Sequence, residues 1–573
     1  MYVILEGFIP SIVLILFYLL VLILAVFITR DIMRTYRRIA KLRLPKNAKE
    51  KAIETITEEK TYCGFLRLTR NELIALGIAF AIMTFLRLPQ YSFLKTNVEE
   101  YFNQFFYSVN TNQGIANTSA RTNGFTYYFL NWLLEQIHVT PFGALVVNLP
   151  LATLSVLISG IVLTRLWGVS ASIPAITVTM LCITLHPFMQ EMFIYRTALL
   201  HWLVFPLAVL PFLVVRNNIC SVAFCGFLLA LSIGGYHSFI NVSLTALLIY
   251  IVTEGCRELR DRPAPSFARL WKRCRMTACS LVFLLGGVFY MIMGFFFRCI
   301  INHERVGTYA GLIALDEIPQ QVHTFAWRYF QLFSPFSPSF DPPLNFILIA
   351  VLFLVVLGMA GIAWGRFSTR LRRKRLLFLT LLLLLLATAS YCAPLGILSL
   401  VNWNAYPPRG VMFISVFWAG IFAVAWFFVQ NHVGLRRSLF VVFSVLLLSY
   451  AYFLSQFLND VYQMARHERE FAIRVVAELE RMPEYHNVKR LCLLPLHPVL
   501  PYMSSFSAVN HMYHRPSFWV ESKYEIINEV TGFKFEPTRE EEYDYDRQYS
   551  DIPAWPTPGC IVIDGDTAII RLL

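Results

Sequence analysis

The sequence predicts a polytopic α-helical membrane protein that ends in a small α/β domain. Its 573 residues are 57% hydrophobic and only 15% charged, and the mean hydropathy is +0.56. Soluble domains rarely exceed about half apolar residues. Several uncharged apolar runs, among them 8–29 and 376–400, also exceed the roughly 18 residues that cross a bilayer as a helix. Composition and run length therefore agree on the fold class.

The positive charge lies in blocks beside the apolar runs. These blocks fall near 30–51, 257–275, 366–375 and 434–437. Lys and Arg near the ends of spans are retained on the cytoplasmic side, so we interpret the net charge of +13 as a sign of membrane topology. A nucleic-acid surface would carry such residues on a folded soluble face. No folded domain is expected there, so the pattern argues against nucleic-acid binding.

Alternating the apolar runs across the bilayer gives about twelve spans and puts every strong basic block on one side. The first run has no cleavage site and is followed by positive charge, which predicts an uncleaved anchor over 1–29. A basic cytoplasmic segment, 30–70, follows, and the multispan domain covers 71–457. Its spans are expected near 71–88, 142–165, a fourth ending near 185, 199–215, 219–234, 238–254, 276–299, 344–364, 376–397, 410–429 and 439–457.

The remainder of the chain, 458–573, is expected to form an α/β domain on the side opposite the basic blocks. A charged amphipathic helix comes first, with Phe471, Val475 and Leu479 at helical spacing. The stretch VKRLCLLPL then predicts a buried strand, and GCIVIDGDTAIIRLL predicts a terminal hairpin around an Asp-Gly-Asp turn. The cysteines of these two stretches, Cys492 and Cys560, could pair there, although spacing alone does not establish a bond.

Four loops are expected on the extracytoplasmic side, at 89–141, 186–200, 300–343 and 398–409. The first contains adjacent acids, Glu99 and Glu100, in an aromatic-rich and Asn-rich stretch, with Arg121 further on. A carboxylate at a membrane–water boundary loses solvation, which raises its pKa and makes it a better general base for a sugar hydroxyl. The alternative is that both acids are solvated loop residues.

The second loop holds Glu191, Tyr195 and Arg196 between two histidines, His186 and His201. One interpretation is a salt bridge in an aromatic belt. The other is a guanidinium that faces a phosphate, since its forked donors fit phosphate oxygens. Position in the sequence favours neither.

Two further residues come from other extracytoplasmic positions. Arg409, in the stretch NAYPPRGVM, opposes the positive-inside tendency, so it either holds an anionic lipid phosphate or makes ordinary headgroup contacts. His237 lies in SIGGYHSFINVS, where a double glycine is expected to let neighbouring backbones approach. A hydrogen-bonded structural histidine is the favoured interpretation of His237.

Several kinds of site are missing from the sequence. The expected span centres carry almost no ionisable residues, whereas ion-coupled transporters keep such groups near the midplane. No nucleotide-binding glycine loop, catalytic triad or metal-ligand spacing is present. We therefore predict no cofactor. A carboxylate pair could hold a divalent cation, but two ligands are too few to assign one.

Five stretches of the chain resemble, in order, segments of the phage-encoded, serotype-converting O-antigen glucosyltransferases of Gram-negative bacteria. The stretches are HPFMQEMFIYRTALLHWLVFPLAVL, LSIGGYHSFINVSLTALLIYI, PPRGVMFISVFWAGIF, FAIRVVAELERMPEY and WPTPGCIVIDGDTAIIRL. The resemblance runs from about Glu72 to the C-terminus and rests on order and spacing more than on any single motif. It implies a multispan fold of the GT-C type.

The resemblance also implies an activity at the bacterial inner membrane. Such enzymes take glucose from undecaprenyl-phosphate glucose at the periplasmic face and attach it to lipid-linked O-antigen repeat units of lipopolysaccharide. Other membrane proteins that synthesise and flip the donor would act upstream. Family members usually carry an Asp-Asp pair and then a Gly-Arg step in the first outer loop, where this chain has Glu99-Glu100 and Ala120-Arg121.

Residue by residue, the resemblance implies that Glu99 or Glu100 is the catalytic base. The groups implied around the donor phosphate and the substrate are Arg121, Glu191, Tyr195, Arg196, His237 and Arg409. Other interpretations stay open at this point: a lipid-linked saccharide flippase or polymerase, a polyprenyl-phosphate-sugar transferase with another sugar or acceptor, and a noncatalytic scaffold.

Overall fold

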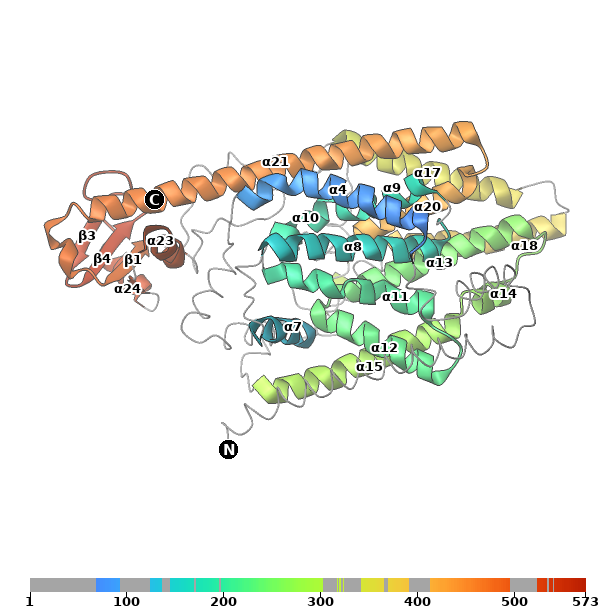
Figure 1. The fold of residues 1–573 in the computed structure, drawn as a ribbon, viewed down its shortest axis with the longest axis horizontal. Helices are drawn as coiled ribbons and strands as arrows, with labels where there is room; N and C mark the ends of the chain where they lie inside the picture. Colours follow the sequence, from blue (N-terminus) through green and yellow to red (C-terminus); the bar gives the residue numbers. More distant parts are fainter. Residues whose placement is uncertain are drawn as a thin grey trace, which may run out of the picture.

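Helices make up most of the described chain, and a small sheet lies near its C-terminus (Figure 1). The structure is a computed structural model. It describes residues 68–92, 124–136, 145–169, 172–194, 197–301, 317, 319–320, 323, 342–364, 369–390, 413–494, 523–532, 535–538 and 541–572. The expected anchor, 1–29, and nearly all of the basic segment 30–70 lie outside these residues.

The bundle consists mostly of apolar helices, and from α11 to α15 the described helices follow one another after short turns. Prolines stand in the first turn of α9, α10, α11 and α17, where the missing N–H has no partner to lose. The helices are α4 (Arg70–Ser92), α7 (Phe125–Gln136), α8 (Leu145–Trp167), α9 (Ile173–Thr184), α10 (Pro187–Ile194), the 3-10 helix η1 (Thr197–Val204), α11 (Pro206–Val214), α12 (Ile219–Gly235), α13 (Phe239–Asp261), α14 (Phe267–Arg273), α15 (Met276–Ile301), α17 (Pro342–Trp364), α18 (Thr369–Ser390), α20 (Ile414–Val429) and α21 (Val433–Leu479).

Five described helices are long and apolar enough to cross a bilayer, which confirms the predicted class of helical membrane protein at this level. They are Arg70–Gln90, Asn148–Trp167, Phe239–Asp261, Met276–Phe297 and Val433–Leu479. Five shorter apolar helices accompany them: Ile173–Thr184, Leu199–Val214, Ile219–Gly235, Ala350–Ala363 and Ile414–Val429. The total of twelve spans and the GT-C arrangement stay predictions.

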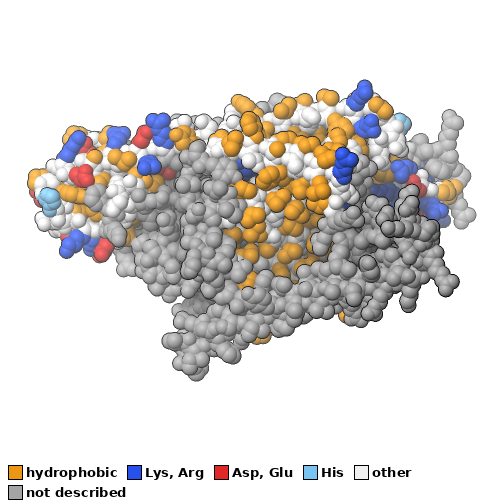
Figure 2. All heavy atoms as spheres, in the orientation of Figure 1, with side chains coloured by type: hydrophobic (Ala, Val, Ile, Leu, Met, Phe, Trp, Pro, Cys, Tyr) orange, Lys and Arg blue, Asp and Glu red, His pale blue; other side chains and the backbone are white. Residues whose placement is uncertain are grey.

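The centre of the bundle is formed by helices that are apolar on every side. All residues of α20 from Ile414 to Phe427 are buried, as expected of a helix that packs on all faces. By contrast, α4, α15 and α21 bury less than a third of their most apolar windows and expose leucine, isoleucine and phenylalanine side chains. Figure 2 shows hydrophobic side chains gathered over the middle of the molecule.

Arginines cluster at one end of the bundle, which we call the basic end. Five of them make contacts there with helix termini: Arg165, Arg257, Arg269, Arg273 and Arg375. The buried Arg375 guanidinium donates to the backbone oxygens of Leu259, Arg262 and Ile362 at 2.6–2.7 Å. Two of the sequence's basic blocks, 257–275 and 366–375, are thereby brought together.

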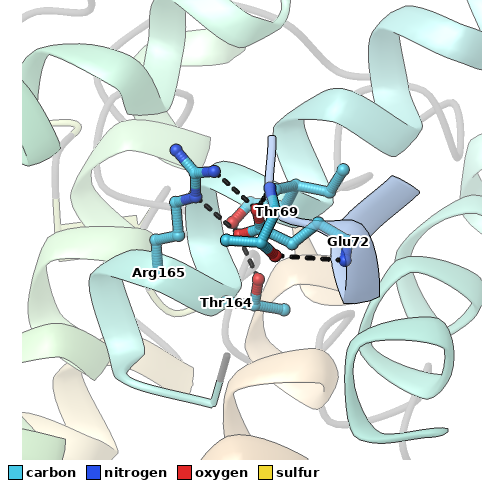
Figure 3. A network of polar contacts seen from close by, with 5 residues as sticks. Thr69, Glu72, Thr164 and Arg165 are labelled. Carbon is cyan, nitrogen blue, oxygen red and sulfur yellow. Dashed lines mark hydrogen bonds and ion pairs between the residues drawn. The ribbon is translucent and has the colours of Figure 1, made fainter. Parts of the chain in front are cut away.

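The start of α4 shows how the basic end is ordered (Figure 3). Thr69 and Glu72 form a capping box: the Thr69 N–H donates to Glu72 Oε2 at 2.7 Å, and the Glu72 N–H donates to Thr69 Oγ1 at 3.3 Å. Glu72 also accepts from Arg165 Nε at 2.6 Å and from its Nη2 at 2.5 Å. The cap of α4 is therefore ion-paired with the last turn of α8.

The opposite end, which we call the domain end, carries the C-terminal domain (Figure 1). The domain contains η5 (Pro483–Asn487), α23 (Lys523–Thr531), α24 (Glu542–Gln548) and a four-stranded sheet in the order β2-β1-β4-β3. The strands are β1 (Arg490–Leu494), β2 (Glu536–Pro537), β3 (Ile561–Asp564) and β4 (Thr567–Arg571), and β1 pairs in parallel with both β2 and β4.

The predicted strand and hairpin of this domain are confirmed. β3 and β4 pair antiparallel around Gly565, whose φ of +60° suits glycine. The predicted amphipathic helix is the last part of α21, where Val475 and Leu479 are buried against the sheet. Cys492 and Cys560 are both free and belong to different hydrophobic clusters, so the bond that the sequence left open is not formed in this structure.

A single helix connects the bundle to the domain. The sequence suggested a span at 439–457 followed by a separate charged helix, but α21 runs without a break through 47 residues. At 1.5 Å per residue this corresponds to about 70 Å. The expected domain boundary at 457/458 therefore lies inside a helix.

Candidate functional site

Most of the site residues predicted from the sequence lie outside the described residues. These are Glu99, Glu100, Arg121, Tyr195, Arg196 and Arg409. The backbone of Glu191 lies in α10, and His237 follows α12. The flanking elements are described, however. The segment with both acids leaves α4 after Ser92 and returns at Gly124, and the pair Tyr195-Arg196 lies between α10 and η1.

A buried guanidinium lies at the domain end of α4, in the stretch from which the acid-bearing segment departs. Arg87 is 1% exposed. Its Nη1 donates to Gln90 Oε1 at 3.0 Å, and its Nη2 donates to Gln190 Oε1 at 2.5 Å. The guanidinium carbon lies 4.0 Å from the centre of the Phe193 ring, a cation–π contact. We call these four residues the Arg87 cluster.

The amide side chains of the Arg87 cluster are themselves fixed by backbone oxygens. Gln90 Nε2 donates to the Phe193 carbonyl at 2.6 Å. Gln190 Nε2 donates to the carbonyls of Thr184 and His186 at 2.8 and 3.0 Å. A buried cation is tolerated only when its N–H groups are satisfied, so these amides must keep their oxygens aimed at Arg87. The cluster therefore joins α4 to α10 and to the end of α9.

His186 supports the turn between α9 and α10. Its Nδ1 accepts from the Phe188 N–H at 3.2 Å, and its ring lies 5.2 Å from the Tyr450 ring of α21. Complete burial lowers the pKa of His186 to about 3. His186 is thus neutral at physiological pH and contributes an acceptor and an aromatic face, not a charge.

A second group of polar aromatic residues lies at the domain end and surrounds His201. The rings of Tyr127 and His201 stack with centroids 4.2 Å apart, and Tyr236 lies 5.3 Å from His201. His201 Nδ1 lies 2.6 Å from the Gly235 carbonyl oxygen, which fixes Nδ1 as the protonated nitrogen. His237 is half-buried beside Tyr236, with centroids 5.1 Å apart. We call these four residues the His201 cluster.

The double glycine expected to allow close approach does so. A Cβ on Gly234 would lie 2.3 Å from the Phe125 ring, and a Cβ on Gly235 would lie 2.2 Å from Val204. The groups that approach are side chains of α7 and η1, whereas the sequence suggested neighbouring backbones. The two glycines thus let α7 and η1 close over the turn that carries His237.

Sequence reasoning missed Arg87, Gln90 and Gln190. One signal was present: the stretch FLRLPQ places an arginine beside proline and glutamine near the end of an apolar run. An ionisable residue in a membrane span is costly and marks a functional or structural site. The partner, Gln190, lies 103 residues away and nothing local identifies it.

The chemistry available at the domain end is cationic and aromatic. The Arg87 cluster places a buried positive charge near this end. The His201 cluster places aromatic rings with hydroxyl and imidazole groups there. Among the described residues, no group of three His, Cys, Asp or Glu side chains could hold a metal ion. Comparison with protein-family models, with curated proteins and with solved structures finds no match to this chain.

Proposed function

We propose that this chain is a multispan membrane glycosyltransferase whose site lies at the domain end. In its specific form the proposal is that it transfers a glucosyl residue from undecaprenyl-phosphate glucose to O-antigen repeat units, at the periplasmic face of a bacterial inner membrane. The resemblance in the sequence suggests the substrates. The arrangement of the described residues supports a site at the domain end.

The Arg87 cluster is the observation on which the proposal rests. It joins the helix that precedes the acids to the helix that precedes Arg196, through bonds from Arg87 to Gln190 and from Gln90 to Phe193. Glu99 follows Ser92 by seven residues and Arg196 follows Ile194 by two. Each residue spans at most about 3.6 Å, so the chain limits how far Glu99 and Arg196 can lie from the helix ends that the Arg87 cluster joins.

The proposed reaction is a single displacement at the anomeric carbon. Glu99 or Glu100 takes the proton of the acceptor hydroxyl, and the hydroxyl oxygen forms a bond to C1 of the sugar. The bond from C1 to the phosphate oxygen breaks, and its electron pair leaves with polyprenyl phosphate. Arg196, Arg409 and Arg121 neutralise the developing negative charge, which is where such a site gains most. Inversion in one step requires one base, so the second acid orients the first or binds sugar.

The interior of the bundle favours a transferase over a flippase. A flippase for lipid-linked saccharides is expected to line a central cavity with charged and polar groups. The central helix α20 instead buries an uncharged run from Ile414 to Phe427 among other apolar helices. Within the described chain, the charged side chains gather at the two ends of the bundle.

The decisive experiment compares E99Q and E100Q in purified, reconstituted protein supplied with a radiolabelled polyprenyl-phosphate sugar and the lipid-linked acceptor. General-base removal is expected to lower transfer by about 100-fold to 10,000-fold in one of the two variants. The exposed Glu484 provides the matched control, E484Q, which should transfer at the wild-type rate. Wild-type transfer by both loop variants would refute the base assignment, and donor movement without transfer would identify a flippase.

A further inference from the structure

The short helix α14 lies at the basic end, between α13 and α15, and is fixed to the bundle (Figure 1). Its Leu270 is 1% exposed. Arg269 Nε donates to Glu258 Oε1 at 2.7 Å, and Arg273 pairs with Glu254. Both acids belong to the last turns of α13 and are buried. These two ion pairs set the orientation of α14 and use two of its three cationic side chains.

The other face of α14 exposes two aromatic side chains one turn apart. Phe267 is 47% exposed and Trp271 is 39% exposed, and their ring centroids are 5.8 Å apart. The indole N–H of Trp271 donates to Thr277 Oγ1 at 2.9 Å. An aromatic body with a hydrogen-bonded polar tip is the arrangement enriched at membrane–water interfaces.

Thr277 is the first residue of an exposed stripe on α15. The stripe continues through Leu281, Leu284, Val288 and Met291, which lie alternately four and three residues apart and are all exposed. α15 is one of the five candidate spans, and only 22% of its apolar window is buried. The stripe therefore fits a surface that faces hydrocarbon, and Trp271 lies at the inner limit of that surface.

Positive charge lies close to the aromatic pair in the sequence. Segment 254–275 carries seven basic and three acidic side chains. Lys272 and Arg262 are exposed, and within the described chain neither forms an ion pair with an acid. We propose that α14 is an interfacial helix that binds anionic phospholipid headgroups, with Phe267 and Trp271 at the acyl boundary and Lys272 and Arg262 on the lipid phosphates. This surface requires only a bilayer, so it stands independently of the proposed enzyme activity.

Lipid binding by the full-length protein tests the charge part of the proposal. Native mass spectrometry of detergent-purified protein would count retained phosphatidylglycerol against phosphatidylcholine. Each cation near an anionic surface strengthens attraction about fivefold, so R262Q/K272Q should weaken phosphatidylglycerol retention by roughly five- to 25-fold. The control R469Q/K489Q removes two exposed cations near and within the C-terminal domain and should retain the wild-type preference. Equal loss in both variants, or loss in neither, would overturn the proposal.

Fluorescence tests the depth of the aromatic pair. The difference between the emission of the wild type and that of W271F reports Trp271 alone. In vesicles of three parts phosphatidylcholine to one part phosphatidylglycerol, this difference should be quenched by lipids brominated near the headgroup and protected from iodide in the aqueous phase. Quenching by iodide with no effect of brominated lipid would mean that α14 faces solvent, as a docking surface for a soluble protein would, and would refute the lipid contact.

Discussion

Burial determines the protonation state of His186. The unfolded chain binds a proton at this side chain below pH 6.5, whereas the folded protein does so only near pH 3. The folded state is thus disfavoured as the pH falls from about 6.5 toward 3, because the unfolded state gains a proton that the folded state cannot accept. At pH 5 the difference amounts to about 2 kcal/mol.

The variant H186N tests this dependence. A carboxamide oxygen can still accept from the Phe188 N–H but does not titrate, so the melting temperature of H186N should fall less between pH 7 and pH 5 than that of the wild type. H486N, at an exposed histidine, serves as the control against which the slope of H186N is compared. Identical slopes in wild type and H186N would show that His186 is not buried in its neutral form.

At the scale of elements, the Arg87 cluster determines how α4 meets α10. Replacing Arg87 with leucine would leave the Gln90 and Gln190 oxygens buried without their donor. Each unsatisfied buried group costs about 1–3 kcal/mol, so R87L should lower the unfolding free energy by about 2–6 kcal/mol in a detergent melt. The surface variant R466A removes an exposed ion pair and should leave the unfolding free energy nearly unchanged.

A double-mutant cycle separates the contribution of the hydrogen bond between Arg87 and Gln190 from a general loss of packing. In R87L/Q190L both partners of the longer-range bond become apolar, and part of the stability should return because no buried acceptor at 190 is left unsatisfied. Strict additivity of the two single changes would argue that the bond between Arg87 and Gln190 contributes little. The same variants should lower sugar transfer in the proposed enzyme, because both candidate segments leave this junction.

The positions of several helices could be predicted from the sequence, and the contacts between them could not. The expected spans at 219–234 and 238–254 correspond to α12 and the first two thirds of α13, since Asn218 caps one helix and the Gly-Gly-Tyr step ends it. Apolar periodicity does not encode which helix faces which. The burial of Arg375 among the carbonyls of two chain segments, and the two-residue strand β2, therefore had no local signal.

The candidate site was less predictable than the fold for the same reason. Glu99, Glu100, Arg196 and Arg409 were chosen by residue type and expected side of the membrane, and their assignment stays a prediction. What the sequence could not supply was the framework around them, since Arg87 and Gln190 become neighbours only when two distant helices pack. The double glycine before Tyr236 was the exception, because a position where another helix packs closely requires a residue without a side chain, and glycine can be recognised in the sequence.

At the scale of the whole molecule, the basic end and the domain end are expected on opposite sides of the membrane, and this topology predicts which cysteines can be labelled from outside. Cys220 is exposed at the start of α12, at the basic end, and Lys489 is exposed in the C-terminal domain. In a background with Cys63, Cys299 and Cys392 changed to serine, a membrane-impermeant maleimide applied to spheroplasts should label K489C but leave Cys220 unlabelled until the membrane is permeabilised. The reverse pattern would invert the topology and remove the basis of the proposed periplasmic site.

The unbroken helix α21 also sets a distance. From the expected end of its span at residue 457 to Leu479, the helix rises by about 33 Å. The C-terminal domain is therefore held at a fixed height above the expected end of the span. This height changes only if α21 tilts. Shortening α21 by whole turns would change that height in steps of about 5.4 Å.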